Sequence, residues 1–198
     1  MADCVVQVRR VREGKDWPDA WKPKDRTYEV TLRDEWFEKP VHVLRARTQV
    51  VFSNHSPEHC NLHGYLQPDP RALTRRDTVF NFGLGANVVR RIVEQAYLKL
   101  PAMYYVTDDI DSAKATWLHA VDSPYVAGPT TLDGRFEITA LPPGTYTVEA
   151  WHQAFALDMP DEEADRPWYV HRPPIVLTRE ITVEPGKDID IDFTFPVD

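Results

Sequence analysis

The sequence has few cysteines and no long apolar run, and each shortage excludes a class of protein. Two cysteines, Cys4 and Cys60, are too few for a framework of several disulfides, and whether they pair with each other stays open. Because no run of about 18 apolar residues occurs, we expect no membrane-spanning helix. Residues 1–4 lead into a charged segment without the apolar stretch of a signal peptide, which indicates a cytoplasmic protein or one whose signal has been removed.

Basic charge is also in short supply. The chain has 23 Lys and Arg against 31 Asp and Glu, and its formal net charge is -8. Nucleic-acid binding needs a basic stripe that faces the phosphates, and a short pair such as Arg75-Arg76 does not form one. We therefore expect a protein or a small molecule as the partner, and no nucleic acid.

Glycine is scarce as well, with 8 residues against 17 prolines. That balance is typical of short strands joined by stiff turns, and it disfavours a helical bundle. A chain of 198 residues can bury one sizeable core, and all-β sandwiches of this length remain one domain. We therefore predict an all-β protein with a single domain over residues 1–198 and at most one or two short helices.

The most specific pattern lies between residues 124 and 152. Asp133-Gly134 is a two-residue turn of the primed type, followed by the alternating segment 135–138. Residues 142–144 make the next reversal, and residues 145–151 alternate between polar and apolar as a strand does. The segment 124–152 is thus predicted to contain two β-hairpins.

Alternation and turn residues predict further strands along the chain. We place them at residues 4–11, 27–32, 41–46, 49–53, 78–82, 103–107, 116–122, 175–183 and 188–195. Residues 54–65 read as an irregular loop rich in histidine, and residues 158–172 as an exposed acidic excursion. Residues 86–98 have the apolar spacing of a helix, although their Val and Ile suit a strand equally well.

Six markers stand in one order along the chain: residues 4–6, Phe37 with Val41, 50–54, 61–65, 79–82 and 124–152. In this order they resemble exported bacterial cupredoxin-like proteins, often labelled methylamine utilisation proteins. The second half of that family also looks like a carboxypeptidase-regulatory module, here within residues 124–152. The resemblance implies a Greek-key β-sandwich and a periplasmic or extracellular location.

The same resemblance implies a site for copper, which blue-copper proteins bind through two imidazoles, one thiolate and a weak axial thioether. The family's first ligand motif is H-N-x-H. In this chain Cys60 takes the place of the first His, while Asn61 and His63 match the rest of the motif.

The second ligand motif of the family, C-D-x-H-x-W-M, is changed at every ligand. Asp108 stands where Cys is expected, Asp111 where His is expected and Lys114 where Met is expected. Because the essential thiolate of this loop is gone, we expect no blue-copper centre.

The altered loops leave three functions open. Cys60, His63, Asp108 and Asp111 could hold a non-blue metal, because thiolate, imidazole and carboxylate suit Zn²⁺ or Cu(II). Alternatively, Lys114 pairs with one of the aspartates, no metal binds, and the protein is an interaction module for a protein or a carbohydrate. The least supported alternative is a hydrolase-like or lyase-like enzyme that uses Asp108 and Asp111 as acid and base, or a metal-bound water.

Two histidines are predicted to belong to strands and not to a site. His42 shares a strand face with Leu44, which favours a buried imidazole with a hydrogen-bond partner. His119 alternates with Leu118, so we place it toward solvent or on the opposite face of the sheet. Loop tryptophans such as Trp17 and Trp36 are candidates for a sugar platform, though more of them are expected to anchor loops or the core.

Overall fold

The computed structural model describes residues 2–9, 11, 14–17, 27–34, 36–67, 77–154, 157–158 and 170–196, without the side chains of residues 67, 88–97, 157–158 and 170–171. These residues form strands and turns, and no helix occurs among them. Accordingly, no described segment is a helix that could cross a membrane. The fifteen strands are β1 (Val5–Val8), β2 (Thr27–Arg33), β3 (Trp36–Phe37), β4 (Val41–Arg45), β5 (Gln49–Asn54), β6 (Cys60–Gln67), β7 (Asp77–Leu84), β8 (Val88–Tyr97), β9 (Ala102–Asp108), β10 (Ala115–Val121), β11 (Val126–Ala127), β12 (Gly144–His152), β13 (Leu157–Asp158), β14 (Val170–His171) and β15 (Ile175–Val183).

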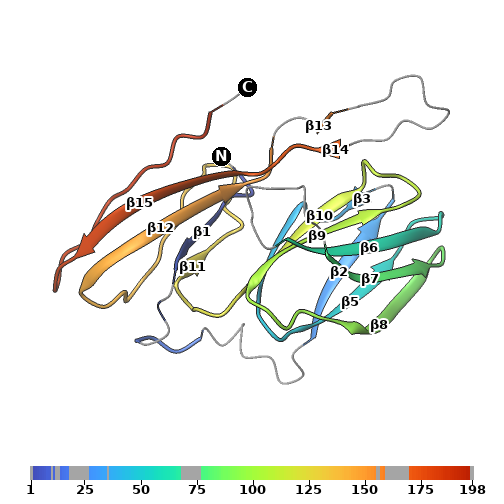
Figure 1. Cartoon of the computed structure of the whole chain (residues 1–198), viewed down its shortest axis with the longest axis horizontal. Helices are drawn as coiled ribbons and strands as arrows, with labels where there is room; N and C mark the ends of the chain where they lie inside the picture. The colour runs from blue at the N-terminus through green and yellow to red at the C-terminus, as the bar shows by residue number, and fades with distance from the viewer. Residues whose placement is uncertain are drawn as a thin grey trace.

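Three sheets build the body of the molecule (Figure 1). We call β3-β2-β5-β8 the outer sheet, β4-β10-β9-β6-β7 the central sheet and β11-β1-β12-β15 the flanking sheet. A fourth, two-stranded ladder pairs β13 with β14. The chain passes repeatedly between the outer and central sheets, so that β2 pairs in parallel with β5, and β4 with β10. Such crossovers are those of a Greek-key sandwich, and the predicted all-β sandwich is confirmed.

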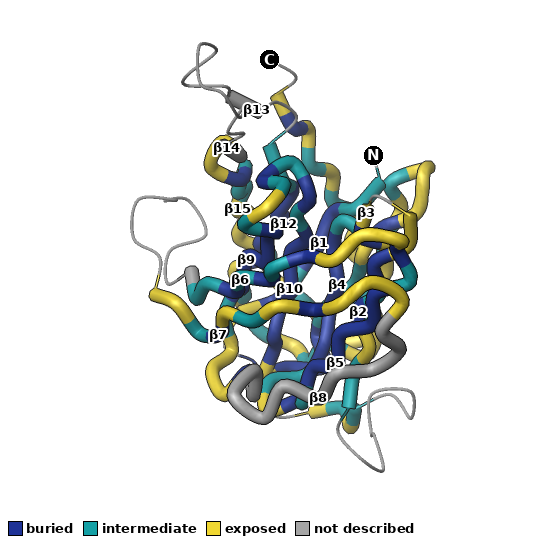
Figure 2. Tube along the Cα trace, turned by 90° about the vertical axis from the view of Figure 1, so that its right-hand side faces the viewer, coloured by how far each residue is buried: buried dark blue, intermediate teal, exposed yellow. Residues whose placement is uncertain are grey.

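The central sheet is covered on both faces. A cluster that includes Val30, Phe52 and Leu118 fills the space between it and the outer sheet. Trp117 and Trp151 belong to a second cluster, which joins the central sheet to the flanking sheet. Six of the seven residues of β10 are buried, as expected for a strand packed on both faces. In Figure 2 the buried residues gather along the middle strands, and the exposed ones lie at turns and loops.

A third apolar cluster covers the other face of the flanking sheet. Segments that contribute to it do not pair as strands, so the prediction of two hairpins is corrected. The predicted turn is present, but it spans Thr131 to Gly134. The amide of Gly134 donates to the carbonyl of Thr131 at 2.9 Å. Gly134 has a φ of 72°, which favours glycine. The segments 135–138 and 188–195 form no strand. The ring centroids of Phe136 and Phe193 lie 6.4 Å apart, and both residues pack on the flanking sheet. Their alternation reflects packing on a sheet face without pairing of strands.

Two further segments differ from prediction. The supposed loop 54–65 ends at Cys60, where β6 begins. Residues 88–97 form strand β8 and pair with β5, so the strand alternative is right and the helix alternative is wrong. The β-branched residues of this segment fit a pleated sheet. Of the predicted excursion 158–172, residues 159–169 lie outside the described residues.

Both cysteines are buried thiols, Cys4 in the flanking sheet's cluster and Cys60 in the sandwich core. No disulfide joins them. Because each thiol is in a different apolar cluster, each packs as a small hydrophobic side chain. Whether the whole chain is a single domain stays a prediction.

Candidate functional site

The predicted site residues lie at one end of the central sheet, where β6 starts and β9 ends. Leu62 of β6 is paired with Asp108 of β9 in the antiparallel ladder. Asp111 and Lys114 follow in the connection to β10. We call residues 58–61 and 108–114 the loop end of the sandwich.

Asp108 is the most buried carboxylate of the loop end, with 1% of its surface exposed. Its Oδ1 accepts hydrogen bonds from the backbone amides of Asn61, at 2.8 Å, and Ile110, at 3.0 Å. Its Oδ2 is buried and has no hydrogen-bond partner among the described residues. Burial raises the pKa of Asp108, although both amides and Lys114 act in the opposite direction. Asp108 thus ties the two halves of the loop end together.

Cys60 is held as a thiol. Its Sγ lies 3.8 Å from the carbonyl oxygen of Leu84, and 4% of the surface of Cys60 is exposed. Burial and the neighbouring charge of Asp108 raise the pKa of Cys60 to about 11. Metals bind the thiolate, so the surroundings of Cys60 oppose the form that a metal ligand must take.

Lys114 supplies a cation at this end. Its Nζ lies 3.6 Å from a carboxylate oxygen of Asp111 and 3.6 Å from one of Glu58, and only 8% of its side chain is exposed. The predicted pairing of Lys114 with Asp111 is therefore present. Asp111 also accepts a hydrogen bond from the amide of Ala113, so both of its oxygens have partners.

His63 belongs to a different network. Its Nδ1 lies 3.1 Å from Asp109 Oδ2 and 2.8 Å from the hydroxyl of Tyr65, and its Nε2 lies 2.9 Å from the hydroxyl of Thr78. The ring stacks on Tyr65 with centroids 4.0 Å apart. The imidazole is thus fixed by Asp109, which is not one of the four predicted ligands.

Asparagines extend this network. Asn61 and Asn81 each donate to Asp109 Oδ2, at 3.0 Å and 3.2 Å, and Asn61 also donates to Asn81 at 2.9 Å. We call Asn61, His63, Thr78, Asn81 and Asp109 the polar shelf. The period of two in β6 puts residues 61 and 63 on one face and could have predicted these two of the five residues. Asn81 and Asp109 join it through pairing of distant strands.

The four predicted ligands do not converge on one point. In the described part of the chain, no three His, Cys, Asp or Glu side chains are placed to hold a metal. His63 is engaged with Asp109, Asp111 with Lys114, and Cys60 is a protonated thiol. A blue-copper ion needs two imidazoles and a thiolate, and these residues do not fit it.

Comparisons with known proteins bear on the fold alone. No family model matches the sequence and no curated protein matches it, so the narrower resemblance to methylamine utilisation proteins and carboxypeptidase-regulatory modules stays a prediction. One similar solved structure is a purple cupredoxin from Nitrosopumilus maritimus, with 8% identity and a TM-score of 0.36, covering 46% of this chain and 97% of that one. Another is Na-dithionite reduced auracyanin from Roseiflexus castenholzii, with 10% identity, a TM-score of 0.35 and coverages of 48% and 96%. At such low identities and TM-scores, these two structures add no support for the fold beyond the observed strand order.

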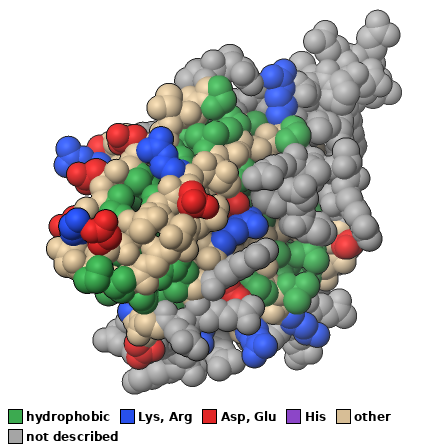
Figure 3. Space-filling model, turned by 60° about the vertical axis from the view of Figure 1, so that its left-hand side comes forward, with side chains coloured by type: hydrophobic (Ala, Val, Ile, Leu, Met, Phe, Trp, Pro, Cys, Tyr) green, Lys and Arg blue, Asp and Glu red, His purple; other side chains and the backbone are tan. Residues whose placement is uncertain are grey.

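The surface carries charges of both signs. In Figure 3 acidic and basic side chains lie close together on the face in view, among apolar and neutral ones. Trp36, predicted in a loop, lies in β3 and is 57% exposed, whereas the ring of Trp17 is covered by the guanidinium of Arg45 at 4.7 Å. Of these two tryptophans, only Trp36 is free to present its ring.

Proposed function

We propose that this chain is a cupredoxin-like binding protein of one domain, which works without a metal at the loop end and holds a protein or carbohydrate partner there. The observation that carries the proposal is the ammonium of Lys114, which is buried and paired with Asp111 and Glu58. It stands where the resemblance expects the axial thioether of copper.

A metal ion at Asp108 would have to share the loop end with this ammonium. Two cations within one partly buried site repel each other, and displacing Lys114 would leave its charge without a partner. The ammonium of Lys114 therefore supplies the positive charge that a metal would otherwise bring. Its ion pairs also hold residues 108–114 in one arrangement, which favours a surface of fixed shape.

The polar shelf supplies the chemistry for a partner. Its amide, imidazole, hydroxyl and carboxylate groups offer hydrogen-bond donors and acceptors side by side. Such a mixture suits the hydroxyls of a sugar or the backbone of a peptide. Asn61 and Asp109 belong to both the shelf and the loop end, so the two features form a continuous surface.

Titration calorimetry with Zn²⁺ and Cu²⁺ tests the absence of a metal from this function. Wild type is expected to bind neither ion stoichiometrically at micromolar concentration, and its melting temperature should not respond to EDTA. A stoichiometric heat in wild type that disappears in Asp108→Asn would contradict the proposal.

A glycan array and a peptide display library, each read with wild type and Asn81→Ala, test the binding surface. The variant should lose the binding that wild type shows, because Asn81 donates to the central carboxylate of the shelf. Thr182→Ala is the matched control: Thr182 is an exposed strand residue whose hydroxyl lies 3.3 Å from that of Thr145. Equal loss in both variants, or binding unaffected by Asn81→Ala, would remove the shelf from the function.

One observation favours the second candidate, a non-blue metal site. Asp108 Oδ2 is buried without a hydrogen-bond partner among the described residues, and its carboxylate lies close enough to Cys60 to raise the pKa of that thiol. A Zn²⁺ ion would satisfy the oxygen and deprotonate the thiol. The calorimetric titration distinguishes this candidate, since it requires binding in wild type and release of a proton from Cys60. The enzyme alternative has less support, because Asp108 and Asp111 have separate partners.

A further inference from the structure

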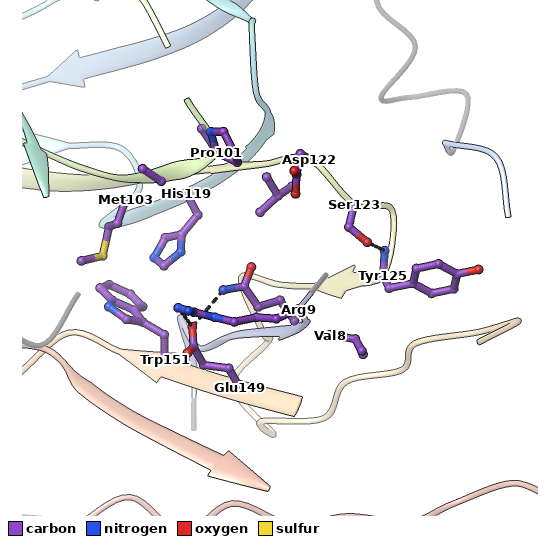
Figure 4. A pocket seen from close by; sticks show the side chains of 14 residues that line it. Val8, Arg9, Pro101, Met103, His119, Asp122, Ser123, Tyr125, Glu149 and Trp151 are labelled. Carbon is purple, nitrogen blue, oxygen red and sulfur yellow. Dashed lines mark hydrogen bonds and ion pairs between the residues drawn. The ribbon is translucent and has the colours of Figure 1, made fainter. Parts of the chain in front are cut away.

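A cavity lies between the central and flanking sheets, away from the loop end. Its volume is about 280 Å³, and it is lined by β1 and β12 on one side and by the ends of β9 and β10 on the other. Figure 4 shows its side chains: His119 and Met103 come from the central sheet, and Trp151, Glu149 and Arg9 face them from the flanking side.

Two residues of this lining each have a buried polar atom that lacks a partner among the described residues. His119 Nε2 and Trp151 Nε1 have no hydrogen bond to any described residue, and the two residues are 6% and 2% exposed. Their rings meet edge to face, with centroids 4.3 Å apart. A buried donor or acceptor without a partner costs about 1–3 kcal/mol. Two such groups beside one cavity need a hydrogen-bond partner, which either water or a bound molecule can supply.

Two charged groups of the cavity, Glu149 and Arg9, neutralise each other. Glu149 is 4% exposed, and its Oε1 accepts hydrogen bonds from Arg9 Nη2 at 2.8 Å and Gln7 Nε2 at 2.9 Å. Burial lowers the pKa of His119 to about 3, so its imidazole is neutral at physiological pH. The inner wall therefore offers no free charge to an ion, and it offers neutral donors and acceptors.

The remaining wall is apolar and the entrance is open to solvent. Met103, Ala102 and Val121 line the central-sheet side, while Arg9 and Asp122 at the rim are exposed. A flat apolar frame can lie against the methionine and the indole, since thioether and aromatic groups pack well together. A molecule can thus enter past the rim and leave its polar end near His119.

We propose that this cavity binds a small uncharged organic molecule that carries a hydrogen-bond donor and an acceptor on a flat apolar frame, as a primary aromatic amide does. The indole of Trp151 can only donate, so the ligand must present an acceptor. A neutral imidazole offers either a donor or an acceptor at Nε2, and an amide meets both forms. The site is separate from the polar shelf and does not depend on the function proposed for it.

Nuclear magnetic resonance titration of the full chain with three probes of similar size tests the proposal. Benzamide should give saturable shifts of the indole N–H of Trp151 and of the backbone amides of residues 119 and 149. Benzoate and ethylbenzene should bind at least tenfold more weakly, because the first brings an uncompensated charge and the second leaves both polar atoms unpaired. Equal binding of benzamide and ethylbenzene, or no saturable shift with any probe, as expected of a cavity that holds only water, would overturn the proposal.

Two variants sharpen the test. His119→Phe should weaken benzamide binding about tenfold, which corresponds to one lost hydrogen bond. His42→Phe is the matched control, since His42 is also buried with an unpartnered Nε2 and a lowered pKa but does not line the cavity. Unchanged affinity in His119→Phe, or equal weakening in both variants, would contradict the proposal. If His119→Phe fails to fold, the comparison of the three probes on wild type decides the matter alone.

Discussion

The two faces of the central sheet are packed with different chemistry. Toward the outer sheet, aliphatic side chains and phenylalanines form one apolar cluster of which Leu118 is a fully buried member. Toward the flanking sheet, tryptophan, tyrosine and methionine surround a cavity into which His119 projects. Leu118 and His119 are adjacent in β10. Because adjacent side chains of a strand point to opposite faces, the two residues belong to different interfaces.

This difference separates stability from recognition. The apolar interface is close to the packing that a sandwich needs: His42 Nδ1 lies 3.0 Å from the hydroxyl of Tyr28, although Nε2 of the same ring has no partner among the described residues. At the flanking interface, the polar atoms of His119 and Trp151 that lack a partner among the described residues lie beside a cavity, and both features cost stability. The cavity distinguishes this interface from the other and makes it the candidate for binding.

The largest expected effect comes from truncating one side chain on each face. Leu118→Ala should lower the free energy of unfolding by about 4 kcal/mol, whereas Met103→Ala should lower it by about 2 kcal/mol. The first opens a new void in close packing, and the second enlarges a cavity that already exists. Urea denaturation of both variants measures the difference. Equal losses would mean that the two faces are packed alike.

Acid should destabilise both interfaces through their histidines. Burial lowers the pKa of His119 to about 3 and that of His42 to about 4, below the usual value near 6.5. The unfolded chain then binds protons that the folded chain excludes. The stabilisation is complete above pH 6.5 and is lost as the pH falls toward the folded values, by up to about 1.4 kcal/mol per pH unit for each histidine.

His119→Phe and His42→Phe separate these two contributions. Each variant should remove about 2–3 kcal/mol of the wild-type loss between pH 6.5 and 4.5, as measured by urea denaturation at several pH values. Benzamide should stabilise wild type and His42→Phe by the same amount at every pH between 6.5 and 4.5, because the imidazole it binds stays neutral there, and it should stabilise His119→Phe less. A slope unchanged in His119→Phe would show that this imidazole is protonated in the folded protein.

The sequence predicts the apolar interface better than the polar one. Alternation placed His42 with Leu44 and His119 on the opposite face, and both placements are confirmed, with His119 buried and not facing solvent. Whether the far side of a sheet is covered depends on the flanking sheet, whose strands lie more than a hundred residues apart in β1 and β12. No local pattern carries that information.

The loop end shows the same limit. The two ligand motifs indicate the positions of Cys60, Asp108 and Lys114 at the loop end, because the spacing of these residues follows the ends of the strands. The motifs do not predict the pairing of His63 with Asp109, because the register between strands decides which of two adjacent aspartates faces a given histidine.

Removing a cation should cost more at the flanking interface than at the loop end. Arg9→Met would leave Glu149, which is almost fully buried, with Gln7 as its remaining side-chain donor among the described residues, and we expect a loss of about 2 kcal/mol. Lys114→Met should cost about 1 kcal/mol, because its partners Asp111 and Glu58 are 42% and 71% exposed and are screened by water. Thermal and urea denaturation at low and high salt check both values. A larger loss for Lys114→Met would place the main electrostatic restraint at the loop end.

Asp108→Asn should have the smallest effect, within about 1 kcal/mol or a few degrees in melting temperature. An amide oxygen can still accept the two backbone hydrogen bonds that Oδ1 now accepts. Because burial raises the pKa of Asp108 above its unfolded value, ionisation at neutral pH opposes folding, and the neutral variant escapes that cost while losing the attraction of Lys114. The variant's stability should therefore vary less as the pH rises above the ordinary pKa of an aspartate, near 3.8. A loss of several kcal/mol would instead mean that the carboxylate of Asp108 and Lys114 act as one tightly coupled pair, which would make the loop end the more strongly ordered of the two regions.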